Sequence, residues 1–140
     1  MRVLPSILLT AVISGVPAMA GAQANSFDGT WNVTLTCPPT SEKEGAKGYT
    51  HKFPAEVKDG HLLGGYGKEG ELGWQRLQGQ IGADGSADLT LDGIVSNTDY
   101  AIGRSPTGKA FRYQVRATFE WSVGTGQRTS GRVCEFRFAR

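Results

Sequence analysis

Two histidines and two cysteines are the residues of this chain best suited to metal or nucleophilic chemistry: His51, His61, Cys37 and Cys134. Imidazole and thiolate groups are the usual zinc ligands, and a site needs three or four ligands around one point. The strand pattern described below predicts that His51 faces into the fold and that His61 faces out. The cysteines are expected to pair with each other. We therefore predict no metal site and no cofactor.

Catalytic motifs are also missing from the sequence, which has no Gly-x-Ser-x-Gly, no His-Glu-x-x-His and no phosphate-loop pattern. By alternation, four carboxylates fall on solvent-facing strand positions, where a solvated carboxyl group is poorly suited to general acid catalysis. These are Glu56, Asp88, Asp92 and Glu120. A hydrolytic enzyme is therefore the least favoured function.

The first 24 residues have the pattern of a secretory signal peptide. A positive start is followed by an apolar stretch over residues 3–16 and by the small-x-small sequence at residues 18–20. Cleavage is predicted after Ala20, Ala22 or Ala24, and a retained N-terminal anchor is the alternative. Residues 25–140 then form one domain without a second apolar run, so we expect no membrane span after cleavage. The chain is predicted to work in the periplasm of a bacterium or outside the cell.

Cys37 and Cys134 are the only cysteines. An exported chain meets an oxidising compartment, where an even pair of cysteines is typical of a disulfide. We predict one Cys37–Cys134 bond; two free buried thiols are the alternative.

Composition excludes long helices. Glycine accounts for 20 of 140 residues, about twice ordinary usage, and 39% of the chain is hydrophobic. Charge is uneven: residues 25–103 hold 6 basic and 11 acidic groups, and residues 104–140 hold 8 basic and 2 acidic ones. The basic part suits an anionic partner, or is simply the solvated face of alternating strands. Nucleic acid is not expected for an exported, nearly neutral chain.

Apolar and polar residues alternate along most of the chain, which predicts strands with one buried face. The longest run covers residues 111–123. The other predicted strands cover residues 31–37, 49–57, 62–66, 77–81, 87–91 and 134–138.

Turn residues predict that sequence neighbours pair as antiparallel hairpins. Asp59-Gly60 suits a two-residue turn that sets Val57 opposite Leu62. Residues 83–85 suit a three-residue loop with Gly85 left-handed, and residues 124–127 a four-residue loop.

The first and last strands also match when Cys37 is set opposite Cys134. Leu35 then faces Phe136 and Val33 faces Phe138, so core positions meet core positions. A closed antiparallel meander needs an even number of strands, and residues 98–103 are the only candidate for an eighth. We predict an all-β, eight-stranded up-and-down barrel, with a β-sandwich as the alternative.

Gly29-Thr30-Trp31 resembles the Gly-x-Trp signature of lipocalin and avidin-like (calycin-type) barrels. Arg140 is similar to the arginine that lipocalins stack across this tryptophan through a cation-π contact. The resemblance implies a barrel closed at the Trp31 end and open at the other. The chain also resembles small exported bacterial proteins and periplasmic barrel inhibitors of secreted metalloproteases.

The predicted topology gathers the long connections at the open end. Inward residues there are candidates for ligand binding: Tyr49, His51, Phe119, Trp121 and Arg132. The aromatic ones are otherwise simply barrel core. Arg132 is expected on the core face opposite Phe119, where its charge needs a carboxylate, a polar ligand or water. A bulge at Gly131 that turns it outward is the alternative.

Three functions follow as hypotheses. The first is a monomeric exported protein that binds an apolar or anionic small molecule in the barrel mouth. The second is a protein-binding or inhibitor module that inserts residues 38–48 and the glycine-rich residues 67–73 into a partner. The third is the hydrolytic enzyme. The volume of the barrel interior separates the first from the others.

Overall fold

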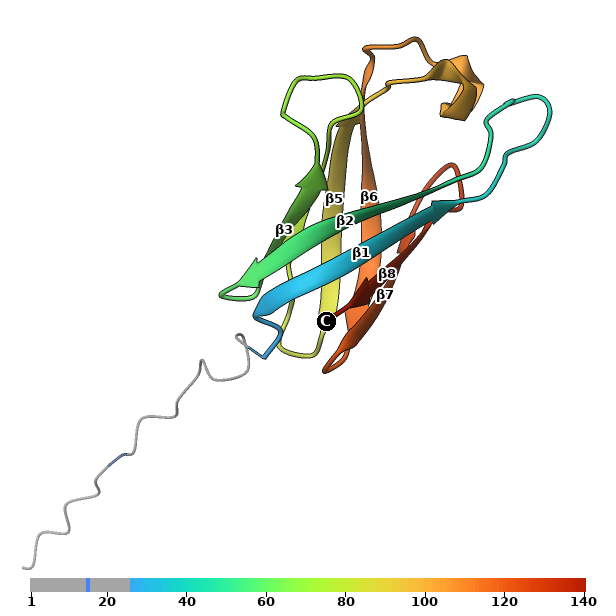
Figure 1. The fold of residues 1–140 in the computed structure, drawn as a ribbon. Helices are drawn as coiled ribbons and strands as arrows, with labels where there is room; N and C mark the ends of the chain where they lie inside the picture. The colour runs from blue at the N-terminus through green and yellow to red at the C-terminus, as the bar shows by residue number, and fades with distance from the viewer. Residues whose placement is uncertain (1–14, 16–25) are drawn as a thin grey trace, which may run out of the picture.

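The chain folds into a closed barrel of eight antiparallel strands in sequence order (Figure 1). This is a computed structural model that describes Gly15 and residues 26–140, so the predicted signal peptide lies outside the described residues apart from Gly15. The strands are β1 (Gly29–Cys37), β2 (Tyr49–Lys58), β3 (His61–Tyr66), β4 (Gln75–Gln80), β5 (Ser86–Ile94), β6 (Ala110–Phe119), β7 (Val123–Arg128) and β8 (Glu135–Ala139). The predicted barrel is confirmed, and the sandwich alternative was wrong.

β1 and β8 close the sheet in the predicted register. Leu35 pairs with Phe136 and Val33 with Phe138, and one step beyond the ladder Cys37 and Cys134 form the disulfide. Apolar side chains from both strands therefore enter the same core, which covers the edges that an open sheet would expose.

Side chains fill the end of the barrel that lies near the C-terminus. Trp31 is fully buried, packs edge-on against Phe119 with 5.4 Å between ring centroids, and donates its indole N–H to the Phe27 carbonyl at 2.8 Å. The Arg140 guanidinium lies 4.8 Å from the centre of the Trp31 ring and donates to the carbonyl of Asp28. The expected stacking of Arg140 on Trp31 is confirmed.

Two short turns at this end have the predicted chemistry. Asp59 and Gly60 both have positive φ, 52° and 76°, as a two-residue hairpin turn requires. Their N–H groups both donate to the Asp28 carboxylate at 2.9 Å. Gly85 is left-handed, with φ 87°, as predicted.

The predicted eighth strand was wrong. Residues 98–103 belong to two short 3₁₀ helices, η1 (Thr98–Tyr100) and η2 (Ile102–Arg104), and the missing strand is β7. The run predicted as one strand over residues 111–123 turns after Phe119, where the Glu120 N–H donates to the Val123 carbonyl at 2.8 Å. The loop predicted at residues 124–127 is therefore strand, with Phe119 paired to Gly124.

Because residues 98–103 form no strand, β6 follows β5 directly and runs opposite to the predicted direction. Phe119 lies at the filled end, beside Trp31, and not at the open mouth. Trp121 sits on the turn at the same end and is 78% exposed. The prediction that these two residues lie at the mouth was wrong. It counts residues 98–103 as a strand before them, which they are not, and omits β7 after them.

One predicted solvent-facing carboxylate is buried instead. Asp92 is only 9% exposed because arginines on both neighbouring strands cover it. Its Oδ1 accepts from Arg112 Nε at 2.6 Å, and its Oδ2 lies 4.0 Å from Arg76 Nη2.

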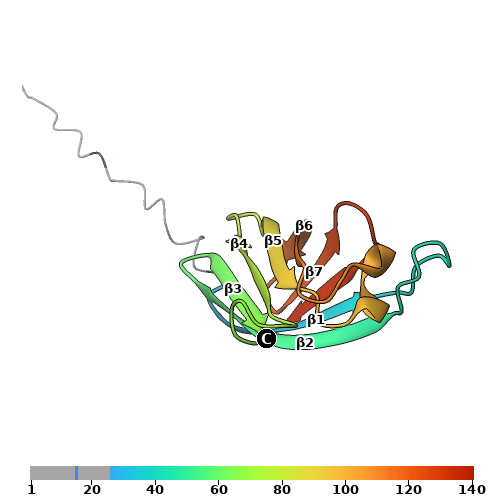
Figure 2. The ribbon, with the colours of Figure 1, turned by 90° about the horizontal axis from the view of Figure 1, so that it is seen from above.

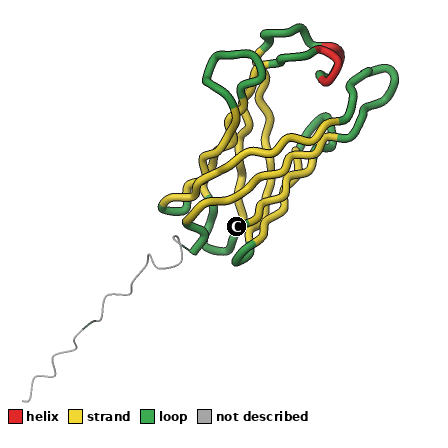
Figure 3. Tube along the Cα trace, viewed as in Figure 1, coloured by secondary structure: helices red, strands yellow, loops and turns green. Residues whose placement is uncertain are grey.

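The long connections lie at the opposite end, together with the two 3₁₀ helices (Figures 1 and 3). They are residues 38–48, 67–74, 95–109 and 129–134. Residues 104–109, expected at the filled end, are therefore at the open one. The described residues include no helix of the length and apolarity that crossing a bilayer requires.

The disulfide spans 97 residues at the β1–β8 junction. In the chain-entropy model, closing a loop of this length stabilises the fold by about 4 to 5 kcal/mol. We expect the Cys37→Ser/Cys134→Ser double variant to lose most of this unfolding free energy in urea titrations, and reductant to destabilise only the wild type. Equal midpoints for the oxidised and reduced wild type would contradict the assignment.

Candidate ligand-binding cavity

A cavity of about 660 Å³ occupies the open end of the barrel. Its sides are the upper ends of the strands, and the segment that contains η1 and η2 borders it. Seen from above in Figure 2, this segment lies next to the β1–β2 connection. Backbone hydrogen bonds join the two, from Lys47 N–H to the Asp99 carbonyl at 2.8 Å and from Gly103 N–H to the Glu44 carbonyl at 3.1 Å.

The floor of the cavity is the top of the hydrophobic core. Tyr113 and Cys134 line the cavity and also belong to the buried cluster below it. Beneath them the interior is filled by Leu, Val, Phe and Trp side chains, which leaves the open end as the place where a molecule could be held.

Aromatic side chains make most of the apolar wall: Tyr49, Tyr66, Tyr100, Phe111 and Tyr113. They come from β2, β3, β6 and η1 because inward positions near the strand ends meet at the mouth. Tyr49 packs edge-on against Tyr100, with ring centroids 6.1 Å apart. Of the candidate residues predicted from sequence, Tyr49, His51 and Arg132 line the cavity, and Phe119 and Trp121 do not.

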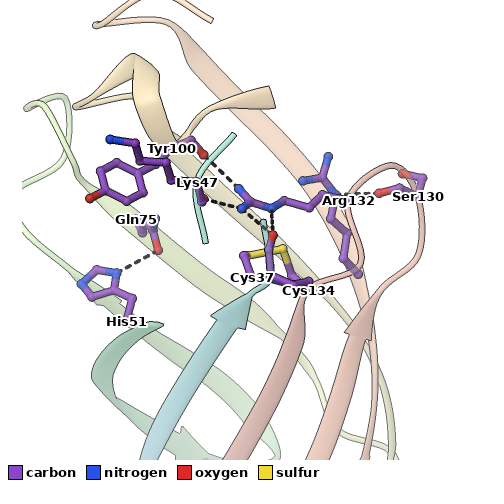
Figure 4. The surroundings of a disulfide bond; sticks show 10 residues. Cys37, Lys47, His51, Gln75, Tyr100, Ser130, Arg132 and Cys134 are labelled. Atoms are coloured by element: carbon purple, nitrogen blue, oxygen red, sulfur yellow. Dashed lines mark hydrogen bonds between the residues drawn. A yellow bond between two sulfur atoms is a disulfide. The ribbon is translucent and has the colours of Figure 1, made fainter. Parts of the chain in front are cut away.

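His51 faces inward, as predicted, from the next inward position of β2. Its Nδ1 lies 3.4 Å from Oε1 of Gln75, and its ring packs edge-on against Tyr66 at 4.6 Å. Figure 4 shows His51 and Gln75 pointing toward one another, from β2 and β4 on either side of β3. His51 thus presents one polar edge within an aromatic wall.

Arg132 is buried, with 6% exposure, and its guanidinium donates to three backbone carbonyls (Figure 4). Nε and Nη2 donate to Pro38 O at 3.0 and 2.6 Å, Nη2 also donates to Lys47 O at 2.6 Å, and Nη1 donates to Tyr100 O at 2.9 Å. The inward orientation was predicted correctly. The expected partner was wrong, because carbonyls of the mouth connections take the place of a carboxylate, ligand or water.

Gly131 permits this orientation without an outward bulge. Its φ of 71° turns the chain after β7, so that Arg132 points back over the disulfide. Arg132 thereby ties together residues 38–48, the η1 segment and the β7–β8 connection. The mouth is held in shape by a buried cation whose donors are nearly all used.

Burial and mutual charge shift the ionisation of this corner. Burial lowers the pKa of Arg132, and the positive charge of Arg128 acts in the same direction. Burial raises the pKa of Tyr49, against the opposing effects of Arg132 and Arg128. The positive charge of Arg128 therefore acts on both Tyr49 and Arg132.

Several cavity residues are not predicted from the sequence, among them Tyr66, Gln75, Tyr113 and the cation Arg128. Arg128 follows Gly124 and Gly126 on the inward face of β7, and its guanidinium carbon lies 4.2 Å from the centre of the Tyr113 ring. Only the alternation of residues 124, 126 and 128 could have identified it. That alternation is not visible as an apolar pattern, because two of the three residues are glycines. Arg128 Nε donates to Ser130 O at 2.6 Å.

The cavity is cationic. Five cationic side chains line it, and none of the Asp and Glu residues within 26–140 does; the five are Lys52, Lys109, Arg112, Arg128 and Arg132. Within the same range, no group of three or more His, Cys, Asp or Glu side chains is placed to hold a metal ion. Comparisons with protein-family models, with curated proteins and with solved structures found no match.

Replacing Arg132 tests its structural role. Hydrogen bonds from charged donors contribute about 1.5 to 3 kcal/mol each, and they are not additive. We expect Arg132→Met to lower the unfolding free energy by about 3 kcal/mol in urea titrations, and Arg132→Lys to restore little, because one ammonium cannot span three carbonyls. The exposed Arg137→Met is the control, within about 0.5 kcal/mol of wild type. Equal losses for the two methionine variants would refute the role.

Tyr113 predicts an alkaline instability. Burial raises the pKa of its hydroxyl above the ordinary value of about 10. Above pH 10 the unfolded chain loses this proton and the folded chain keeps it, so stability falls as pH rises. Tyr113→Phe should flatten the fall in unfolding free energy between about pH 9 and about pH 11, roughly one unit on each side of that value. The exposed Tyr66→Phe should not, and identical slopes for all three proteins would contradict the prediction.

Proposed function

We propose that this protein is an exported bacterial binding protein that holds a small, largely apolar molecule in the open end of its barrel. The observation that carries the proposal is the cavity of about 660 Å³ above a filled core. Pockets for small molecules commonly measure about 300 to 1,000 Å³, with mostly apolar walls and a few polar groups. Five aromatic rings match the apolar walls, and His51, Gln75 and Arg128 are among the polar groups.

The resemblance to lipocalin and avidin-like barrels supports the same function. The strand order, the filled end and the stacking of Arg140 on Trp31 are features that such barrels share. In barrels of this size the interior is wide enough for side chains or for one small ligand. Here side chains fill one end and leave the other free.

The disulfide supports export. Such bonds persist in oxidising compartments and are rare in the cytosol. The Cys37–Cys134 bond also lies beside the cavity, where Cys134 lines the wall. We infer that the protein acts in the periplasm or outside the cell, as a monomer.

A protein-binding or inhibitor module is the second candidate. The β1–β2 connection projects beyond the barrel in Figure 1, and Leu72 in the β3–β4 connection at the same end is 60% exposed. Exposed loops on a rigid scaffold are a common way to engage a partner. Ligand binding inside the cavity distinguishes the first candidate from this one.

The test uses N-phenyl-1-naphthylamine, a neutral apolar probe that fluoresces when shielded from water. We expect saturable binding to the processed protein. His51→Trp puts a larger side chain on the cavity wall and should weaken binding about tenfold, a change of about 1.4 kcal/mol.

Thr50→Trp is the matched control, because this neighbouring β2 residue is exposed on the outer face. It should bind the probe like the wild type. Absence of saturable binding, or equal affinity in both tryptophan variants, would overturn the proposed function in favour of the protein-binding candidate.

A further inference from the structure

Arg128 is a cation at the cavity wall with no acidic partner. Three arginines of the outer sheet face are paired, Arg76 and Arg112 with Asp92 and Arg116 with Asp88, whereas the exposed Arg137 of β8 has no ion pair within residues 26–140. Arg128 makes no ion pair within residues 26–140, and only its Nε has a hydrogen bond there, to Ser130 O. Its two Nη groups therefore have no partner in the described chain. We call this pair of N–H donor groups the fork, because together they can bind one oxyanion.

Arg132 does not supply the same capacity, although it lies in the same corner. Four hydrogen bonds to three carbonyls engage four of its five N–H donors. A ligand that took Arg132 would have to break the contacts that hold the mouth connections. Arg128 is thus the guanidinium that can receive a ligand without cost to the fold.

Tyr113 adds a second group that needs a partner at this corner. Its ring lies under the Arg128 guanidinium, the residue is 7% exposed, and its hydroxyl is buried with no hydrogen-bond partner in the described chain. A buried hydroxyl without a partner costs about as much as a lost hydrogen bond. An acceptor group bound beside Arg128 would accept hydrogen bonds from the Tyr113 hydroxyl and from the Arg128 Nη groups.

The field at this corner selects for negative charge. The Arg128 and Arg132 guanidinium groups repel each other, and no carboxylate of residues 26–140 lines the cavity; Glu44 of the β1–β2 connection offsets the charge of Arg132 from outside it, as the smallest of the contributions to the pKa of Arg132. A single free fork matches one planar or tripodal oxyanion of unit charge in bidentate fashion. The remaining wall combines the aromatic side chains with Lys52, Lys109 and Arg112, and Arg112 is already paired with Asp92. Its aromatic part suits an apolar body.

We propose that Arg128 and the Tyr113 hydroxyl form a subsite for one singly charged oxyanion, a carboxylate or a sulfonate, on a ligand whose apolar body fills the aromatic part of the cavity. This inference rests on the proposed function and names the ligand class of that same cavity. It moves the anion-binding role from Arg132, where sequence reasoning put it, to Arg128.

The experiment compares two probes with the same apolar body. 8-Anilinonaphthalene-1-sulfonate carries a sulfonate that N-phenyl-1-naphthylamine lacks. We expect the wild type to bind the sulfonate more tightly, and Arg128→Gln to weaken sulfonate binding about tenfold or more while the neutral probe stays within about twofold. Tyr113→Phe should weaken the sulfonate about threefold, with the neutral probe unchanged.

Arg116→Gln is the matched control, since this arginine on the neighbouring β6 faces outward and is highly exposed. It removes the same charge from the molecule without touching the cavity, so both probes should bind as in the wild type. Arg128→Lys keeps the charge and loses the fork, and it should recover only part of the sulfonate affinity. Neutral-probe binding reports whether each variant is folded.

Competition then tests the carboxylate. Naphthalene-1-carboxylate should displace the sulfonate probe from the wild type several-fold better than naphthalene-1-carboxamide, and this preference should vanish in Arg128→Gln. If the neutral probe binds but the sulfonate has no advantage, or if Arg128→Gln and Arg116→Gln act alike, the subsite is refuted and the cavity function stands. If neither probe binds, both proposals fail.

Discussion

The pairing of β1 with β8 is the contact on which the rest of the molecule depends. It turns a meander into a closed barrel and sets Cys37 beside Cys134. It also carries Arg132, two residues before Cys134, to the carbonyl of Pro38, one residue after Cys37. The seam that removes the sheet edges therefore also anchors the connections around the cavity. At the other end of the same seam, Arg140 reaches Trp31 and covers the filled end.

Seven of the eight strands could be predicted because their inward residues are apolar and alternate. β7 could not, because its inward positions Gly124 and Gly126 carry no side chain. A Cβ at Gly124 would come within 2.9 Å of the Phe119 ring, so large neighbours take the volume that β7 leaves. The alternation of β6 meanwhile continues through Trp121 and Val123, which lie on and after a turn and are exposed. An alternating pattern predicts a strand from apolar residues alone, and here it includes Trp121 and Val123, which do not face the core.

The candidate site was predicted in part for a related reason. Tyr49 and His51 were placed correctly, since the register of β2 follows from its own alternation and its turn. Arg132 was expected inside with an unknown partner, and its partners are carbonyls that are 94, 85 and 32 residues away in sequence. Backbone groups of irregular connections leave no mark in residue types, so no pattern could identify them. Arg128 was hidden together with its strand.

The filled and hollow parts of the barrel differ in the chemistry of their inward residues. Phe119 and the buried leucines have no polar side-chain atom, and the indole N–H of Trp31 has its partner in the Phe27 carbonyl, so these side chains pack without water; the leucines are Leu35, Leu62, Leu77, Leu89 and Leu91. Toward the mouth the inward positions become His51, Gln75, Arg128 and Arg132, whose polar atoms would each be costly in a dry, filled core. Four inward polar residues from four parts of the chain converge at one level of the barrel. A cavity that water or a ligand with a polar group can enter allows these polar side chains to face inward. The hydrophobic core therefore ends where they line the barrel.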